Sequence, residues 1–450
     1  MDFRLINQKR HFDIIIWDKF KSGHNIYFMG EKTDVLAASM IGTIIEWYGI
    51  FIFSMGAIYI AHEFYPSVSV AEGVLLTLLT FALGFVTRPI GAYVFGHYGD
   101  RIGRKKILLL TLLISGISTG LTGLIPSANQ IGYMAVVLLV VLRLALGFGL
   151  GGEWGGAMLL TLETFKKKRG FYSSFVQSTV SIGLLLGSAV FIPLVSIFPS
   201  SFMYSTGWRI PFLASFVIVI VGVFIRLKVK ETPIFEAEKK NNKILKSPGK
   251  ELFTKHWKKV IIGTFLAGTT GNIFYFAVTL LPVLFESTKK ITVFDGLIGT
   301  AIFGMIEMTF IYIGGPLSDK LGRRPIIAFA NIIALVVLFP AIYLISFGYF
   351  ILFISILAVA SGLGMAPMAA MISEIFPTDV RYSGNSACYQ YGNSFIGGPN
   401  PYISDFLGGI LYPLYPVFTT IFIFIALGTL YRTKESNEIS LEEDYLTKAI

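Results

Sequence analysis

Charged residues are scarce in this chain. Its 450 residues include Lys+Arg 37 and Asp+Glu 27, and together these make 14% of the sequence, whereas an ordinary soluble domain carries about a quarter. The mean hydropathy of +0.70 and an apolar fraction of 54% agree with this shortage. Intrinsic disorder is excluded, because disordered chains combine low hydrophobicity with high charge. Most of the chain is therefore expected to lie in a lipid bilayer.

The residues that build metal and cofactor sites are also scarce. Cys388 is the single cysteine and the five histidines are scattered, so neither an internal disulfide nor a zinc cluster is expected. The sequence lacks a P-loop, since Gly249-Lys250 is followed by Glu251. A Gly-x-Gly-x-x-Gly pattern at 147–152 lies in a long apolar run, so its glycines favour close helix packing over dinucleotide binding. We expect no metal, no cofactor and no enzymatic activity.

Long apolar runs, by contrast, recur along the chain. Continuous runs of roughly 20 residues predict membrane helices, because the strands of a membrane barrel alternate instead. The early run Ile14–Trp17 is too short for the core of a signal peptide, so the first span is expected to serve as the targeting signal. The sequence predicts an all-α integral membrane protein with twelve helices, over residues 35–61, 73–96, 107–126, 131–162, 171–198, 209–227, 260–286, 295–316, 325–346, 349–375, 383–408 and 411–431.

Positive residues are distributed unequally between alternate loops. With the N-terminus placed inside, the outer loops hold only Arg209, Lys289 and Lys290, and the inner segments hold nearly all the rest, most densely between Arg226 and Lys259. Cytoplasmic loops carry the excess of Lys and Arg in membrane proteins. The sequence therefore predicts a multi-pass protein of the cell (plasma) membrane with both termini in the cytoplasm.

One motif occurs twice, at the inner ends of spans two and eight. Residues 96–105 and 315–324 carry Gly, Asp, Gly and Arg at the same spacing, with an offset of 219 residues. Two related six-helix halves that rock about a midplane site are typical of secondary transporters. The predicted organisation is an N-terminal cytoplasmic extension, a first half, a cytoplasmic linker, a second half and a cytoplasmic tail, at 1–34, 35–227, 228–259, 260–431 and 432–450.

The repeated motif resembles that of the major facilitator superfamily. Other segments resemble the metabolite:proton symporter family within it, whose members import organic acids, shikimate, proline and betaine. This resemblance covers nearly everything from about 35 to 430 and implies the two-half fold and alternating access. The segments that carry it include Ile-Glu-Trp-Tyr at 45–48, Arg-Pro-Ile-Gly at 88–91, Gly-Gly-Glu-Trp-Gly-Gly-Ala at 151–157, Trp-Arg-Ile-Pro-Phe at 208–212 and Glu-Thr-Pro-Ile-Phe at 231–235.

The chain departs from the family pattern at two positions. Gly49-Ile50 stand where the family usually has Asp-Phe, and Leu146 stands where a glutamine is common. The first departure removes a candidate proton carrier, so another acid is expected to couple protons in this chain.

Ionisable residues in the predicted spans are few, and each costs at least about 2.5 kcal/mol to insert. The candidates for proton coupling are Glu46, Glu153 and Glu307. Arg143 and Glu153 lie on one helix, about 15 Å apart along its axis at 1.5 Å per residue, so they cannot pair with each other. Both are expected to engage groups on other spans, with Glu46 and Arg88 the nearest candidates. A purely structural role remains the alternative for Glu46 and Glu153, and the family resemblance does not single out Glu307.

Several side chains in the spans are candidates for substrate binding. The arginine fork binds a carboxylate bidentately, so Arg88 or Arg143 can hold either a protein acid, in a structural ion pair, or an anionic substrate. Polar groups of span eleven suit either a cavity or helix–helix hydrogen bonding. The set is Arg88, Arg143, Tyr48, Gln177, Asn385, Tyr389 and Asn393.

The resemblance also implies a charged latch that closes the cytoplasmic side. Acids and arginines at the inner helix ends would pair across the two halves and set the balance of inward and outward states. The residues assigned to this cytoplasmic gate are Asp100, Arg101, Arg104, Glu163, Arg169, Asp319, Arg323, Glu374 and Arg381.

These features together predict a secondary active transporter. It would couple import of a small, anionic carboxylate metabolite to a proton gradient, as a monomer in the lipid bilayer and without a nucleic-acid partner. Two alternatives stay open from the sequence, namely a proton-coupled efflux transporter of the same fold and a membrane sensor that does not transport.

Overall fold

The computed structural model describes residues 31–102, 104–165, 167–228, 248–345, 349–377, 380–411 and 414–437. Within these ranges the ordered elements are helices, and no strand occurs. The predicted N-terminal extension, linker and tail lie mostly outside the described residues.

Helices overlap each of the first six predicted spans. The first span is divided between α2 (Glu31–Met55) and α3 (Ala57–Phe64), which meet at a bend of 63°. The following helices are α4 (Val70–Val86), α5 (Arg88–Ile102), α6 (Arg104–Thr122), α7 (Ala128–Ile131), α8 (Tyr133–Leu150), α9 (Trp154–Thr164), α10 (Arg169–Ile197), α11 (Ser200–Phe202), the π-helical segment η1 (Met203–Gly207) and α12 (Arg209–Lys228).

Helices overlap the last six predicted spans as well. The seventh span continues from α15 (Trp257–Tyr275) through the π-helical segment η2 (Phe276–Leu280) into α16 (Leu281–Ser287). The remaining elements are α14 (Pro248–Lys255), α17 (Val293–Leu321), α18 (Arg323–Ile345), α19 (Phe350–Glu374), α20 (Arg381–Gly392), the π-helical segment η4 (Asn393–Gly397), α21 (Asn400–Ile410) and α22 (Val417–Arg432).

Length and hydropathy identify many of these helices as membrane spans. In the described part of the chain, 7 helices are long and apolar enough to cross a bilayer, and two bent pairs raise the number to 9. Two shorter apolar helices, Lys106–Thr122 and Val417–Arg432, lie in predicted spans three and twelve. The protein is therefore an all-helical membrane protein, while a total of twelve spans stays a prediction.

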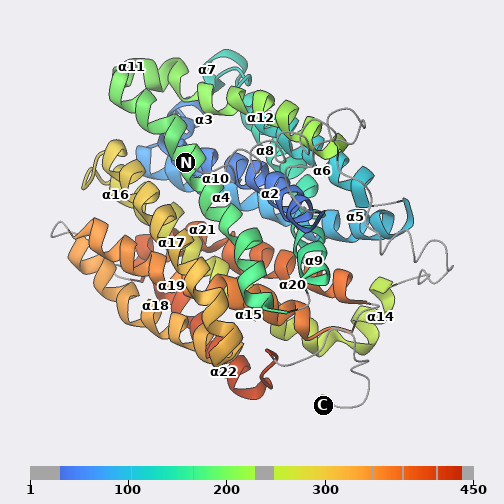
Figure 1. The fold of residues 1–450 in the computed structure, drawn as a ribbon. Helices are drawn as coiled ribbons and strands as arrows, with labels where there is room; N and C mark the ends of the chain where they lie inside the picture. The colour runs from blue at the N-terminus through green and yellow to red at the C-terminus, as the bar shows by residue number, and fades with distance from the viewer. Residues whose placement is uncertain are drawn as a thin grey trace, which may run out of the picture.

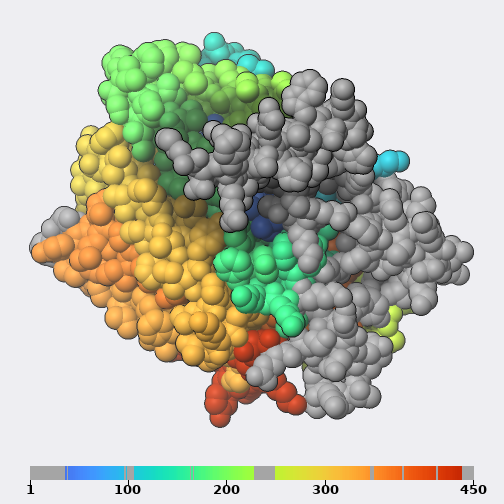
Figure 2. All heavy atoms as spheres, in the orientation of Figure 1, coloured from blue at the N-terminus to red at the C-terminus, as the bar shows by residue number. Residues whose placement is uncertain are grey.

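The helices form two groups in space. Figure 1 shows α2–α12, the N-terminal group, mainly in the upper part and α15–α22, the C-terminal group, in the lower part. The two groups meet along α10, which packs against α17 and α19, and along α20, which packs against α5 and α9. On the face drawn in Figure 2, the yellow and orange surface of the C-terminal group adjoins the green surface of the N-terminal group.

A stripe of small polar residues on α10 makes one contact between the groups. Ser173 donates to the carbonyl oxygen of Ala366 at 3.0 Å, and Ser174 donates to that of Ile311 at 3.1 Å. Ser173 and Ser174 are adjacent on α10 and therefore point in different directions, one toward α19 and the other toward α17. Their small size lets the helices approach closely in lipid. The stripe therefore joins α10 to α17 and α19 through backbone acceptors.

The glycines of the 147–152 pattern pack as the sequence analysis expected. A Cβ atom at Gly147 would overlap the carbonyl oxygen of Gly84, and one at Gly151 would overlap the backbone around Arg88. These glycines thus let α8 lie directly against α4 and α5, and the packing interpretation is confirmed.

Candidate functional site

A buried acid and a buried arginine lie near each other in the N-terminal group. Glu46 on α2 and Arg88 on α5 are 4% and 1% exposed, and Glu46 lies within electrostatic range of Arg88. Within the described ranges, Arg88 forms no ion pair with a protein carboxylate at 4.0 Å or less. Glu46 Oε2 and Arg88 Nε also lack a hydrogen-bond partner. Both groups therefore retain hydrogen-bonding capacity that a ligand can use.

Aromatic residues from both groups of helices surround Arg88. Its guanidinium carbon lies 4.0 Å from the ring centre of Phe85, and that ring lies 5.3 Å from Tyr275 of α15. Tyr275 and Tyr389 both interact electrostatically with Arg88. Tyr389, on α20, stacks on Trp154 of α9 with ring centres 3.6 Å apart. The site is thus built where the two groups meet, and Tyr275, Phe85 and Trp154 are members that the sequence did not single out.

Two of the predicted substrate residues are hydrogen-bonded within the protein. Tyr48 donates to the carbonyl oxygen of Pro211 at 2.7 Å. Gln177 accepts from Trp154 Nε1 at 2.7 Å and donates to the carbonyl oxygen of Met365 at 3.3 Å. Gln177 therefore connects the stacked indole of Trp154 to α19, so its geometry is that of a support for the site.

The predicted residues of α20 and η4 divide into two kinds. Asn393 donates to the carbonyl oxygen of Tyr389 at 3.0 Å and so reinforces its own helix. Asn385 is fully buried, yet neither its amide nitrogen nor its amide oxygen has a hydrogen-bond partner. Because an unpaired buried amide is costly, Asn385 is the better candidate for a ligand contact.

Arg143 occupies a different environment from Arg88. It donates to Thr122 Oγ1 at 3.2 Å, and its guanidinium carbon lies 4.4 Å from the ring centre of Phe53. Its contacts are thus a hydroxyl and an aromatic face, the second of which attracts a cation.

Glu153 is paired with a residue at the end of predicted span six that was counted only among the inner positive residues. Arg226, near the end of α12, forms an ion pair with Glu153, and Thr111 donates to the same carboxylate at 3.3 Å. The packing of α12 against α2 and α6 brings Arg226 inward, where it is 7% exposed. The expected ion-pair partner, Arg88, was therefore wrong, and only the three-dimensional path of α12 reveals the right one.

Glu307 on α17 contacts two serines. Ser181 of α10 donates to its Oε2 at 2.8 Å, and Ser361 of α19 donates to its Oε1 at 2.6 Å. The side chain is fully buried. Glu46 and Glu153 lie within electrostatic range of each other. Glu307 is held by two hydroxyl groups instead, so its environment differs from that of the other two candidate proton carriers.

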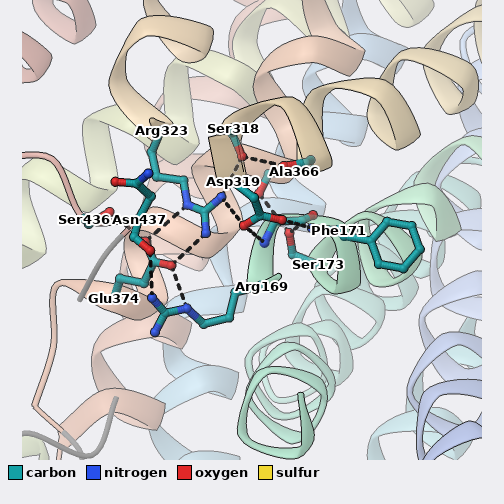
Figure 3. A network of polar contacts seen from close by, with 12 residues as sticks. Arg169, Phe171, Ser173, Ser318, Asp319, Arg323, Ala366, Glu374, Ser436 and Asn437 are labelled. Atoms are coloured by element: carbon teal, nitrogen blue, oxygen red, sulfur yellow. Dashed lines mark hydrogen bonds and ion pairs between the residues drawn. The ribbon is translucent and has the colours of Figure 1, made fainter. Parts of the chain in front are cut away.

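A charge network joins the helix ends predicted to form the cytoplasmic gate. Figure 3 shows Glu374 of α19 between two arginines, Arg323 of α18 and Arg169 of α10. Glu374 Oε1 lies 3.0 Å from Arg323 Nη2 and 3.0 Å from Arg169 Nε. Because Arg169 belongs to the N-terminal group and the other two to the C-terminal group, the network bridges the groups.

Asp319 extends this bridge to the start of α10. Its two carboxylate oxygens accept from the backbone nitrogens of Gly170 and Phe171, each at 2.9 Å, and Arg323 Nη1 lies 2.8 Å from Oδ1. A carboxylate at a helix N-terminus binds unpaired N–H groups and complements the helix dipole. Asp319 thus acts as a cap supplied by another helix.

Residues after α22 join the same network. Glu435 accepts from the backbone nitrogens of Arg323 and Arg324 at 2.7 and 3.1 Å, which caps α18. Ser436 donates to Glu374 at 2.6 Å, and the carbonyl oxygen of Asn437 accepts from Arg169 at 3.3 Å. These residues could not be predicted from the sequence, because no motif marks a polar tail as a helix cap.

Arg381, on α20, is the other predicted gate residue whose side chain lies in the described part of the structure. Arg381 donates through Nε to the carbonyl oxygen of Phe376 at 3.1 Å. The side chains of the remaining four lie outside the described part of the structure, and these are Asp100, Arg101, Arg104 and Glu163.

Comparisons with known proteins agree with the fold. The sequence profile of the Major Facilitator Superfamily matches residues 39–397 and 291–443. The inner membrane metabolite transport protein YhjE of Escherichia coli is 38% identical over 391 residues, with 84% of this chain and 88% of that protein covered. A shikimate transporter of Escherichia coli is 34% identical, covering 81% of this chain and 85% of that protein. A citrate-proton symporter of Klebsiella pneumoniae is 31% identical, covering 84% and 86% respectively.

A solved structure shares the fold. The proton:xylose symporter XylE superposes with a TM-score of 0.72 over 91% of this chain and 98% of that one, at 19% identity. The homologues are transporters rather than enzymes, and their metabolite substrates agree with the resemblance read from the sequence. The chain therefore belongs to the Major Facilitator Superfamily and is a membrane transporter related to metabolite transport proteins and proton symporters.

Proposed function

We propose that the chain imports a small carboxylate metabolite together with protons by alternating access. The observation that carries this proposal is Arg88, which is buried where the two helix groups meet and has no ion-pair partner among the described residues. A guanidinium binds a carboxylate bidentately. The related citrate-proton symporter and shikimate transporter support an anionic substrate.

The neighbouring acid supplies a physical basis for coupling. Glu46 lies within electrostatic range of Arg88, so its ionised form competes with an anionic substrate for the guanidinium. Protonation of Glu46 removes that competing charge, and substrate and proton thereby favour each other's binding. The proton gradient then serves as the energy source, and no cofactor takes part.

The proposed architecture has twelve spans in two halves, at 35–227 and 260–431, joined by the linker at 228–259. The excess of Lys and Arg in the predicted inner segments supports a cytoplasmic location for both termini in the plasma membrane. Because residues of both helix groups build the site within one chain, a monomer is the proposed functional unit.

The bridging network is proposed as the cytoplasmic latch. Arg169 and the N-terminus of α10 lie on one side of it, and Asp319 and Glu374 lie on the other. Opening the cytoplasmic side separates these groups, so the latch sets the balance of conformations and leaves substrate choice to the site around Arg88.

Uptake into proteoliposomes tests the proposed function. Vesicles with an alkaline interior are offered a mixed pool of organic acids, amino acids and betaines, which is read by mass spectrometry. We expect one carboxylate to accumulate and a protonophore to abolish the accumulation. Transport only with the gradient reversed would establish the efflux alternative, and tight binding without flux would establish the sensor.

Replacement of Arg88 tests the substrate contact. Arg88→Gln is expected to raise KM about 10- to 100-fold, because a hydrogen-bonded contact to a charged group contributes about 1.5–3 kcal/mol. The exposed Arg432 at the end of α22 provides the matched control, Arg432→Gln, which should leave KM unchanged. An unchanged KM in Arg88→Gln would show that Arg88 does not contact the substrate.

A further inference from the structure

Glu307 is a buried acid whose contacts are hydroxyl groups. Ser181 and Ser361 reach its two oxygens at 2.8 and 2.6 Å. The buried acids Glu153 and Glu374 each have an arginine partner instead. Insertion of an isolated charge in a membrane helix costs at least about 2.5 kcal/mol, so the position of Glu307 favours a neutral carboxylic acid.

The charged residues of the surrounding helices are distant. The charged residue of α10 is Arg169, about 18 Å along the helix from Ser181 at 1.5 Å per residue. The charged residue of α19 is Glu374, about 20 Å along the helix from Ser361. The other titratable groups on α17 and on the helices packed against it lie at helix ends or face other partners. The Tyr312 hydroxyl of α17, for example, lies 2.9 Å from Ser178 Oγ. The remaining groups are Asp295, Asp319 and Lys320 of α17, Arg323, Arg324 and Tyr343 of α18, and Glu286 of α16.

The two serines suit both protonation states of this acid. A serine hydroxyl donates one hydrogen bond and accepts others. Both serines donate to an ionised Glu307, whereas a protonated Glu307 donates through its own O–H to one of them. The pocket therefore holds the proton without requiring a countercharge.

The pocket is divided between the two helix groups. Ser181 belongs to α10 of the N-terminal group, and Glu307 and Ser361 belong to α17 and α19 of the C-terminal group. A Cβ atom at Gly362 would lie 2.5 Å from the Glu307 carbonyl oxygen, so α19 is in close contact with α17. The Glu307 side chain is buried in this conformation, and separation of α10 from α17 when the groups rock would open the carboxyl to water.

We propose that Glu307 carries a transported proton. With α10 apart from α17, the carboxylate takes a proton from water on the side to which the site is open. Contact with Ser181 and Ser361 then holds the neutral acid. On reopening to the other side, the O–H bond breaks and the proton passes to water. This inference rests on the proposed function, since proton movement there drives substrate uptake.

Infrared difference spectroscopy of the full chain in lipid nanodiscs tests this inference without substrate. At neutral pH the wild-type protein is expected to show the C=O stretch of a protonated carboxyl that Glu307→Gln lacks. Ser361→Ala should shift this band. Ser188→Ala should not, because the buried hydroxyl of Ser188 bonds to its own helix at Leu184. Identical spectra for the wild-type protein and Glu307→Gln would overturn the proposal.

Transport by the same variant gives a second readout with the mixed substrate pool. Glu307→Gln is expected to retain exchange of internal for external substrate and to lose accumulation driven by the pH gradient. Accumulation at the wild-type level would overturn the proposal. Failure of the wild-type protein to accumulate any compound would contradict the proposed symport instead, and the infrared band would still decide whether Glu307 holds a proton.

Discussion

Glu153 and Arg226 form a buried ion pair whose role the packing helps to define. Both side chains are nearly inaccessible, and Thr111 supplies a further hydrogen bond. Loss of one member leaves the other charge buried and unpaired, whereas replacement of both members is often neutral. This pairing favours the structural alternative for Glu153 and leaves Glu46 and Glu307 as the proposed proton carriers.

A double replacement tests that assignment. Glu153→Gln alone is expected to lower the free energy of unfolding by about 3–5 kcal/mol, and adding Arg226→Met should restore most of it. Chemical unfolding of the purified variants in detergent measures both effects. The exposed pair Glu251–Lys255 provides the control, because Glu251→Gln should cost far less. A double variant as unstable as the single one would contradict the structural assignment.

The sequence predicted some residues of the site and not others, for physical reasons. Acids and arginines in apolar runs are conspicuous because each is costly in lipid, and this rule singled out Glu46, Arg88 and Glu307 as candidates. The same rule did not single out Arg226, because basic residues are common at the cytoplasmic ends of membrane helices. Tyr275 and Trp154 were not predicted either, because aromatic residues are common in membrane helices. Only the interaction of Tyr275 with Arg88 and the stacking of Trp154 on Tyr389 distinguish them.

At the scale of an element, the N-terminus of α10 depends on a glycine. A Cβ atom at Gly170 would overlap the carbonyl oxygen of Gly315 and would lie 2.5 Å from Arg323 Nη1 and 2.7 Å from Ser318 Oγ. The close crossing of α10 and α17 places the first N–H groups of α10 against Asp319. A larger residue at position 170 must therefore displace α10 from this acceptor.

Gly170→Ala is accordingly expected to favour the inward-open conformation. Labelling of cysteines introduced near the cytoplasmic end of α10 should become faster, and substrate competition should stay unchanged. Gly428→Ala on α22 is the matched control, because a Cβ atom there meets nothing within 4 Å, and alanine in a helix should stabilise by about 0.5–1 kcal/mol. Unchanged labelling in Gly170→Ala would show that the crossing tolerates the methyl group.

The helices themselves were more predictable than their contacts. Apolar runs predicted the helices well, because an unpaired backbone group is costly in lipid and a helix pairs these groups within one segment. The divisions within spans were not predicted, such as the 63° bend between α2 and α3 or the π-helical segment η2. These breaks follow from tertiary packing, whereas hydropathy reports only on burial in lipid.

At the scale of the whole molecule, the charge network contains two kinds of contact. Arg169 reaches from the N-terminal group to Glu374 and to the Asn437 carbonyl oxygen, so it links the groups. Arg323 reaches Asp319 and Glu374 within the C-terminal group, so it holds that group together. Opening of the cytoplasmic side must break the contacts of Arg169 between the groups and can leave the contacts of Arg323 within the C-terminal group intact.

The two arginines should therefore respond differently to replacement. Arg323→Gln leaves two acids near a fully buried position without their shared cation, and we expect a loss of stability of about 3–5 kcal/mol. Arg169→Gln should change stability less, because Glu374 keeps Arg323, and should instead increase cytoplasmic accessibility. Thermal unfolding in detergent and cysteine labelling measure the two effects. Equal losses of stability with no gain in accessibility would mean that the network only supports the fold, since a latch must yield when the halves separate.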